Sequence, residues 1–275
     1  MMAADVQKGV GLPLLDFLLS FSPMTLALIL TLFTWLVTAL GAAVVFFFAE
    51  MNVRLLDLLT GFGAGVMIAS SFWSLLQPAL ESEGRFSLLL VCLGFVFGGA
   101  FILAADRAFD LFDFEHRFGL ETASWRRSLM LILAVTVHNI PEGMAVGVAV
   151  GSAALGLPGA TTLGAAVLAA GIALQNFPEG ASVSLPLRRE GMSLPRCFFY
   201  GQLSGMPEPI AGVIGAALAL WVGPALPFFL SFAAGTMIAV VTGEMIPASA
   251  SSSKSLAVVG VTFGFLVMMV LDVVF

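Results

Sequence analysis

Residues 87–105 read SLLLVCLGFVFGGAFILAA, a run of 19 residues without a charged side chain. Apolar stretches of about 20 residues recur along the whole chain, and this is the length that a helix needs to cross a bilayer. Of the 275 residues 60% are hydrophobic and 10% are charged, and the mean hydropathy is +1.07. The sequence therefore predicts an all-α membrane protein and excludes a soluble enzyme and a disulfide-stapled secreted domain. The net charge of −6 leaves no basic surface for a nucleic-acid partner.

Apolar windows, read against charges and helix breakers, predict eight transmembrane helices in a single transmembrane domain of residues 1–275. The connections between them are short, except for a third loop from Arg107 to Ser124. We place the spans at about 24–49, 55–80, 86–106, 125–151, 160–187, 195–221, 225–250 and 255–275.

The basic residues predict the orientation of these spans. Nine of the 11 Lys and Arg residues lie in the loops after spans one, three, five and seven, and only Lys8 and Arg85 lie on the opposite side. Cytoplasmic loops carry an excess of Lys and Arg. We therefore expect a multi-pass protein of the cell (inner) membrane with both termini outside the cytoplasm. The nine residues are Arg54, Arg107, Arg117, Arg126, Arg127, Arg188, Arg189, Arg196 and Lys254.

Two internal repeats are visible. FGAGVMIA at residues 62–69 resembles FAAGTMIA at 232–239, an offset of 170, and HNIPEG at 138–143 resembles QNFPEG at 175–180. The members of each pair lie on spans that run in opposite directions, so the repeats are inverted, with spans 1–3 matching 6–8 and span 4 matching 5. Inverted repeats with Pro-interrupted helices are typical of secondary transporters that bind substrate near the membrane midplane.

Ionisable side chains lie within the predicted spans, although no Lys or Arg lies well inside a span to pair with them. Such groups are costly in a bilayer. Either they are neutral, hydrogen-bonded groups at helix contacts, or they await a cation. The group comprises His138, Glu142, Glu179, Glu208 and Glu244, with Asp106 and Asp272 near span ends.

Their spacing favours the cation. His138, Asn139 and Glu142 share one helical face, and Gln175, Asn176 and Glu179 repeat the arrangement on the next span. Carboxylates, an imidazole and amide oxygens together suit a divalent ion such as Zn²⁺, Fe²⁺, Mn²⁺ or Cd²⁺. Met67 is a candidate soft ligand, although a methionine in an apolar span more often packs.

These paired motifs resemble those of the Zrt/Irt-like (ZIP) metal transporters, in particular a bacterial GufA-like branch. The resemblance extends over nearly the whole chain and includes SGMPEP at 204–209 and GEMIP at 243–247. It implies an uptake transporter with Zn²⁺ as the favoured substrate and no organic cofactor. It also implies a homodimer and an elevator-like movement of spans one, four, five and six against the other four.

The resemblance further implies a binuclear metal site between spans four and five. The implied primary ligands are His138, Glu142, Gln175 and Glu179, with Met67 adjacent. Asn139, Asn176 and Glu208 would complete a second site, with Glu142 and Glu179 bridging the two. Glu81 and Asp272 would lie where ions arrive from outside, and Asp106 and Glu244 where they leave.

Three features depart from the family pattern. Gln175 and Asn176 are neutral where many members have histidine and some have aspartate, and Gly243 stands where some relatives place a ligand. The third loop offers only His116 in place of a histidine cluster, and we interpret His116 as a solvated loop residue. Two other functions stay open: an intramembrane metal-dependent enzyme and a metal-gated channel. With two histidines and no His-Glu-x-x-His motif, we expect the chain not to be an enzyme.

Overall fold

The computed structural model describes residues 17–48, 52–82, 87–111, 123–222 and 225–274, and within these ranges it contains helices and no strand. This confirms the predicted all-α class. Loop residue His116 lies outside the described residues. The principal helices are α3 (Pro23–Ala43), α4 (Val53–Ser70), α5 (Gln77–Glu81), α6 (Ser87–Leu111), α8 (Ala123–Ala154), α9 (Thr162–Arg189), α10 (Leu194–Gly205), α11 (Pro207–Trp221), α12 (Leu226–Val240), α13 (Ile246–Ser249) and α14 (Lys254–Val274).

Six helical segments of the described chain are long and apolar enough to cross a membrane, which agrees with six of the predicted spans. Helices α8 and α9 lie where the fourth and fifth spans are predicted, and their 32 and 28 residues are ample for a bilayer. The protein is thus a multi-pass helical membrane protein, while the count of eight spans stays a prediction. The six segments are Pro23–Phe46, Val53–Glu81, Ser87–Ala105, Leu194–Trp221, Leu226–Ser249 and Lys254–Val274.

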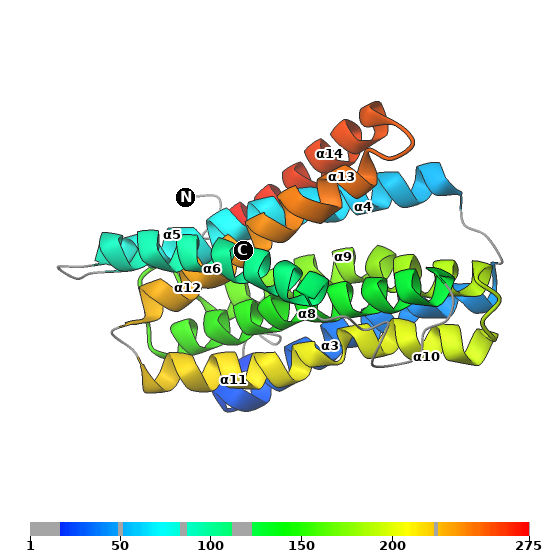
Figure 1. The fold of residues 1–275 in the computed structure, drawn as a ribbon. Helices are drawn as coiled ribbons and strands as arrows, with labels where there is room; N and C mark the ends of the chain where they lie inside the picture. Colours follow the sequence, from blue (N-terminus) through cyan, green and yellow to red (C-terminus); the bar gives the residue numbers. More distant parts are fainter. Residues whose placement is uncertain (1–16, 49–51, 83–86, 112–122, 223–224, 275) are drawn as a thin grey trace.

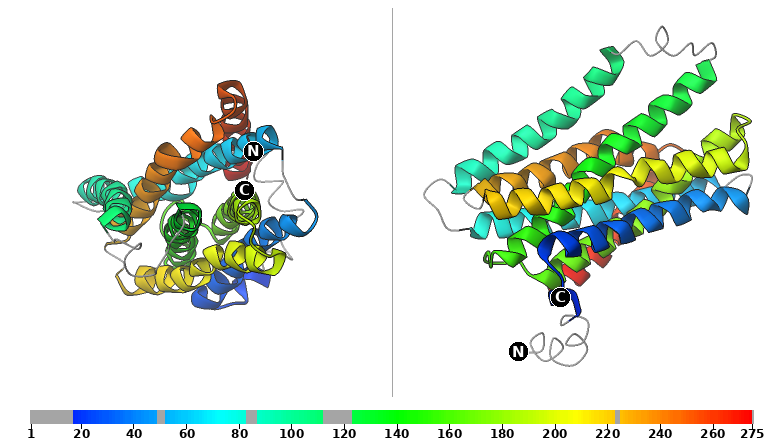
Figure 2. Two further views of the ribbon diagram at one scale, coloured as in Figure 1. Left: turned by 45° about the vertical axis from the view of Figure 1, so that its right-hand side comes forward. Right: turned by 90° about the horizontal axis from the view of Figure 1, so that it is seen from below.

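The helices form two groups. Helices α3, α8, α9, α10 and α11 pack on one another and are called the motif bundle here, because α8 and α9 carry the two repeated motifs. Helix α4 packs on α14, and α6 packs on α12; these four helices, with α5 and α13, form the flanking layer. In Figure 1 most of this layer, with α4 and α14, lies above α8, α9 and α3, and Figure 2 shows the same separation from a second direction.

Glycines bring the helix pairs into close contact. A Cβ added at Gly65 or Gly264 would collide with the backbone of α14 or α4, respectively, and the same holds at Gly147 against α11 and at Gly180 against α3. Small residues let two membrane helices approach until their backbones touch, which increases van der Waals contact where lipid supplies no hydrophobic drive. Each pair is therefore fixed by backbone-to-backbone packing.

The inverted repeat is visible in the local helix geometry. A π-helical turn at Ser71–Leu76 follows α4, and a second at Val241–Met245 follows α12, so the two turns begin 170 residues apart. Helices α4 and α12 run in opposite directions (Figure 1). π-Helical turns are rare and often occur at functional sites. The offset equals that of the sequence repeat, which supports the predicted match of span two with span seven.

Five of the basic residues on described helices lie together at one end of the protein. Arg54 is near the start of α4, Arg188 and Arg189 end α9, Arg196 is in the first turn of α10, and Lys254 begins α14. The start of α4, the turn from α9 to α10 and the connection from α13 to α14 all lie at the right-hand end of Figure 1. By the excess of basic residues in cytoplasmic loops, we expect this end to face the cytoplasm.

Adjacent glycines on α6 allow a direct test of the packing. A Cβ at Gly98 would collide with the Phe232 carbonyl oxygen of α12, whereas a Cβ at Gly99 meets nothing within 4 Å. We expect Gly98→Ala to lower stability by about 1–3 kcal/mol through overpacking. Gly99→Ala should leave stability unchanged or raise it slightly, because alanine favours the helix. Thermal unfolding of both variants in detergent measures the difference, and equal midpoints would contradict it.

Candidate metal centre

The two repeated motifs lie on unbroken helices. Pro141 is inside α8, and Pro178 is inside α9. The expected interruption at these prolines is therefore absent from the described backbone. A proline removes one backbone donor, but neighbouring helices in a membrane bundle can keep the turn intact. Asn139 and Glu142 consequently stay one turn apart on the same face, as do Asn176 and Glu179.

Glu208 reaches the same region from a helix that does break. Helix α10 ends at Gly205, and α11 begins at Pro207, so Glu208 lies in the first turn of α11. A carboxylate is favourable at this end of a helix because unpaired N–H groups give it a partial positive charge. A Cβ at Gly143 would collide with the backbone carbonyl of Glu208. Gly143 therefore lets α11 place Glu208 directly beside the motif of α8.

Three amides donate to the three carboxylates of this region. Gln175 Nε2 donates to Glu142 Oε1 at 2.5 Å, and Asn176 Nδ2 donates to Glu208 Oε1 at 2.8 Å. Asn139 Nδ2 donates to Glu179 Oε1 at 3.4 Å. Buried carboxylates need such donors, because an unsatisfied charged group costs several kcal/mol.

The centre also holds oxygen atoms that no donor reaches. Asn139 Oδ1 and Glu179 Oε2 are buried and accept no hydrogen bond. Among the described side chains, no group of three or more His, Cys, Asp or Glu is arranged to hold a metal ion alone. Amide and carboxylate oxygens together are the ligands on which a divalent ion would depend here. The unpartnered oxygens fit such an ion.

A cavity of about 400 Å³ reaches this centre from one end of the helices. Glu142, Gln175 and Glu179 line its inner end, and Asp57 and Arg189 line it close to the basic end of the protein. The cavity lies between the motif bundle and the flanking layer, since α4, α8, α9 and α12 all contribute to its wall. The centre is thus accessible from the side that we expect to be cytoplasmic.

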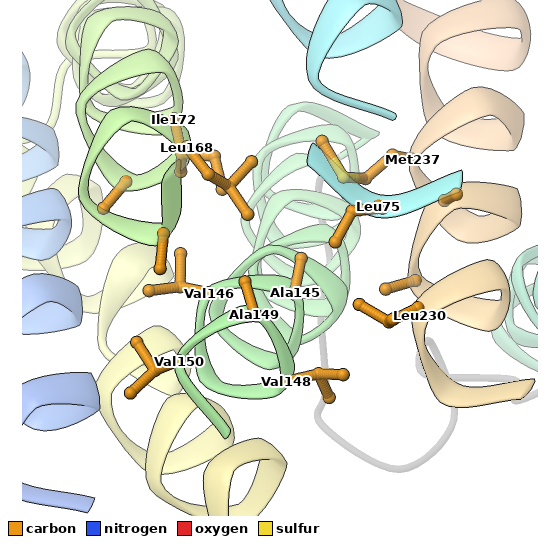
Figure 3. Close-up of a cluster of buried hydrophobic side chains, with 14 of the residues drawn as sticks. Leu75, Ala145, Val146, Val148, Ala149, Val150, Leu168, Ile172, Leu230 and Met237 are labelled. Atoms are coloured by element: carbon orange, nitrogen blue, oxygen red, sulfur yellow. The ribbon is translucent and has the colours of Figure 1, made fainter. Parts of the chain in front are cut away.

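Apolar side chains close the other side of the centre. Ala145 of α8 and Ile172 of α9 lie one turn beyond Glu142 and Gln175, and both are almost fully buried. Leu75 of the π-helical turn after α4 and Leu230 of α12 pack into the same cluster, and Figure 3 shows Ala145 beside Leu75. An apolar cluster of this kind opposes passage of a hydrated or charged ion.

The remaining predicted site residues lie at several places. Met67 is 1% exposed and belongs to the apolar cluster, and Glu244 lines the large cavity. Asp272 accepts from Ser74 at 2.7 Å in a second cavity of about 130 Å³ at the opposite end, with its Oδ2 unpartnered, and Glu81 is exposed nearby. The side chains of His138 and Asp106 lie outside the part that the structure describes.

Two polar residues, one at the centre and one at the basic end of its cavity, could not be identified from the sequence. Thr34 of α3 donates through its hydroxyl to Glu208, although a lone threonine in an apolar helix gives no recognisable signal. Asp57 is 4% exposed and accepts from Ser251 Oγ at 3.1 Å and from the Ser252 backbone at 2.9 Å. Asp57 lies in the first turns of α4, close in sequence to Arg54, so the sequence suggests an exposed loop-proximal residue and not a buried one.

Known protein sequences resemble this chain over most of its length. The sequence model of the family described as ZIP Zinc transporter matches residues 115–272. Zinc transporter ZIP11 of Xenopus tropicalis is 39% identical over 92% of this chain and 98% of its own length. Zinc transporter GufA of Myxococcus xanthus is 36% identical over 90% and 98%, and Zinc transporter ZIPB of Bordetella bronchiseptica is 35% identical over 86% and 76%.

These relatives are named as transporters, which confirms the expectation that the chain is not an enzyme. The family model covers more than half of the chain, and the relatives cover most of it. The resemblance carried by the two motifs on α8 and α9 is therefore confirmed, and the chain belongs to the ZIP family of zinc transporters.

Proposed function

We propose that this protein transports divalent metal ions across the cell membrane, with Zn²⁺ as the favoured substrate and Fe²⁺, Mn²⁺ and Cd²⁺ as further candidates. The observation that carries the proposal is the convergence of Glu142, Glu179 and Glu208 in the membrane part of the protein, where each accepts a hydrogen bond from an amide. Glu142 and Glu179 also line the large cavity. The relatives named as zinc transporters support the choice of ion.

Two metal ions would be held by two adjoining sets of ligands, one ion in each set. The first comprises His138, Glu142, Gln175 and Glu179, with Met67 adjacent, and the second adds Asn139, Asn176 and Glu208. Glu142 and Glu179 would be shared between the two ions. The unpartnered oxygens of Asn139 and Glu179 support this assignment, since a cation would satisfy them.

The two sides of the centre and the membrane potential support uptake as the direction of transport. The large cavity opens toward the basic end, and the apolar cluster lies on the other side, so this conformation would release ions into the cytoplasm. A membrane potential of 100 mV, negative inside, contributes about 4.6 kcal/mol for a doubly charged ion, which favours uptake.

Alternating access would arise from movement between the two helix groups. Glycines bring backbone against backbone within each group, whereas Gly63 and Gly171 at the boundary meet side chains of the other group. The apolar cluster at this boundary contains mostly alanine, valine and leucine side chains. Such a surface carries few directional bonds, so one group can shift against the other at low cost. We propose that the motif bundle moves like an elevator against the flanking layer.

The path outside the centre would use acidic residues at both ends. Asp272 and Glu81 near the smaller cavity would receive ions, and Glu244 and Asp106 would accompany their release. We further propose that residues 1–275 form one transmembrane domain with both termini outside the cytoplasm, that the membrane is the inner membrane, and that the protein forms a homodimer.

Removing the shared carboxylates should abolish transport. We expect Glu142→Ala and Glu179→Ala to reduce initial Zn²⁺ uptake into proteoliposomes more than tenfold, because each leaves both ligand sets incomplete. Glu190→Ala, at the exposed end of α9, is the matched control and should keep normal uptake. Detergent thermal stability monitors folding, and near-normal uptake by either variant would refute the shared site.

Glycine substitutions can separate packing from metal binding. Gly143 and Gly147 both contact the α11 backbone, but only Gly143 adjoins Glu142 and faces Glu208. Both alanine variants should lose about 1–3 kcal/mol of stability. Only Gly143→Ala should also weaken Zn²⁺ binding, measured by titration in detergent against a competing chelator. Equal binding by the two variants would mean that Glu208 is not a ligand.

Cysteine labelling would test the sidedness. With Cys92 and Cys197 replaced by serine, Thr60→Cys lines the large cavity and Ala160→Cys lines the small one. A membrane-impermeant thiol reagent should label Thr60→Cys from the cytoplasmic side and Ala160→Cys from the outside. Labelling of Thr60→Cys from both sides would indicate a continuous pore. Labelling of Thr60→Cys from the outside alone would mean that the predicted orientation in the membrane is wrong.

A further inference from the structure

We propose that Gln175 and Asn176 form a hydrogen-bonded relay through which the first metal ion prepares the site for the second. The inference rests on the proposed transport function and concerns the regulation of the same centre. Gln175 and Asn176 are neighbours in the chain, and both are neutral amides that are at most 1% exposed. Their hydrogen bonds connect a carboxylate of the first ligand set to the carboxylate that belongs to the second set alone.

The relay is a continuous chain of donors. Gln175 Nε2 donates to Glu142 Oε1 at 2.5 Å and to Asn176 Oδ1 at 3.0 Å. Asn176 Nδ2 donates to Glu208 Oε1 at 2.8 Å and to the Thr34 carbonyl at 3.3 Å. Both N–H groups of each amide therefore have a partner. The two amides thus satisfy the Glu142 and Glu208 carboxylates, which would otherwise need a positively charged partner.

The direction of these bonds opposes metal binding. An ionised carboxylate only accepts hydrogen bonds, so an amide that faces it presents its nitrogen. A divalent ion instead binds the amide oxygen. For Gln175 to become a ligand, its amide must turn, and its nitrogen then leaves both Glu142 Oε1 and Asn176 Oδ1. The first ion thereby removes the bond that holds the Asn176 oxygen.

The released Asn176 can then turn its own oxygen toward a second ion. Its nitrogen gives up Glu208 Oε1 in the same movement. The Thr34 hydroxyl meanwhile donates to the other oxygen, Glu208 Oε2, and Glu208 is 0% exposed. We therefore assign Thr34 as a positioning residue, which keeps the Glu208 carboxylate in place while its other oxygen changes partner.

The relay predicts an unusual binding curve. Two doubly charged ions that share two carboxylates repel one another, so without a relay the second ion should bind more weakly than the first. With the relay, the first ion has already broken the hydrogen bond from Gln175 to Asn176, which otherwise keeps the Asn176 oxygen from binding the second ion. We expect the second ion to bind about tenfold more tightly after the first, a coupling of ordinary size for two linked sites.

Asn139 supplies a matched control. Its Nδ2 donates to Val135 O of its own helix at 2.9 Å and to Glu179 at 3.4 Å, so it contacts a shared carboxylate without belonging to the relay. Asn139→Asp and Asn176→Asp therefore add the same charge to the second ligand set. Only Asn176→Asp removes the donor that holds Glu208, while it leaves an oxygen that can accept from Gln175.

The test is a Zn²⁺ titration of the full chain in detergent, with bound metal counted. Wild type and Asn139→Asp should bind two ions with a Hill coefficient above one. Asn176→Asp should bind two ions with a Hill coefficient of one or less. Binding of a single ion by wild type, a wild-type Hill coefficient of one or less, or the same coefficient for both variants would overturn the relay.

The role of Thr34 has its own control on the same helix. Thr31 is also 0% exposed, but its hydroxyl donates to the Ala27 carbonyl of α3 at 2.7 Å. Thr34→Val should weaken the second ion about tenfold and leave the first unchanged, since one hydrogen bond to a charged group is lost. Thr34→Ser should restore the affinity, and Thr31→Val should not alter it. Equal effects of the two valine variants would remove Thr34 from the proposal.

Zn²⁺ uptake into proteoliposomes separates this inference from the proposed function. Uptake by wild type together with independent binding of two ions would refute the relay and leave transport standing. Absence of both Zn²⁺ binding and uptake in folded wild-type protein would instead refute the transport function, and the relay with it.

Discussion

The structure depends on the cost of placing three carboxylates within a membrane. Glu142, Glu179 and Glu208 lie among apolar helices, where an unpaired charge is expensive and water is scarce. The sequence provides no Lys or Arg in their part of the spans. The side-chain nitrogens of Asn139, Gln175 and Asn176 donate hydrogen bonds to these carboxylates in place of a basic side chain. An amide donor is weaker than a cation, so the arrangement is stable enough to fold and still open to displacement.

The hydrogen bonds between these amides and carboxylates join different helices, so the helix backbones must approach closely. Glycines permit that approach. Gly143 admits the carbonyl of Glu208, and Gly180 admits that of Thr38, so the glycine that ends each repeated motif serves packing and the preceding glutamate serves the site. The motif bundle is consequently rigid where the ligands lie. Its contacts with the flanking layer are made mainly through side chains, including Gln175 against Gly63 and Met268 against Gly171. This contrast supports the proposed movement at the boundary between the two groups.

Much of this could be predicted from the sequence, because hydrophobic length, basic loops and repeated motifs are local signals. These signals predicted where the helices lie and which polar residues share one face of α8 and of α9. They also gave the repeat offset of 170 residues that the two π-helical turns follow. The amides were identified as oxygen ligands, but their present use as donors depends on which carboxylate each one meets. Thr34 and Asp57 could not be found, since their partners Glu208 and Ser251 lie 174 and 194 residues away. The unbroken course of α8 and α9 through Pro141 and Pro178 likewise depends on neighbouring helices.

The same cost of buried charge argues for a carrier rather than a channel. On one side of the centre a cavity of about 400 Å³ provides carboxylates and space for water, and on the other side Ala145, Ile172 and Leu75 leave an ion nothing to bind. An ion crossing that cluster would have to shed its hydration without gaining ligands, which the membrane potential alone does not repay. It can reach the outside only if the ligands themselves come to face the other cavity, near Asp272. Apart from Met67, the proposed ligands lie on α8, α9 and α11. The proposed movement would therefore carry the motif bundle as a unit, and the glycine contacts that hold the bundle together support it.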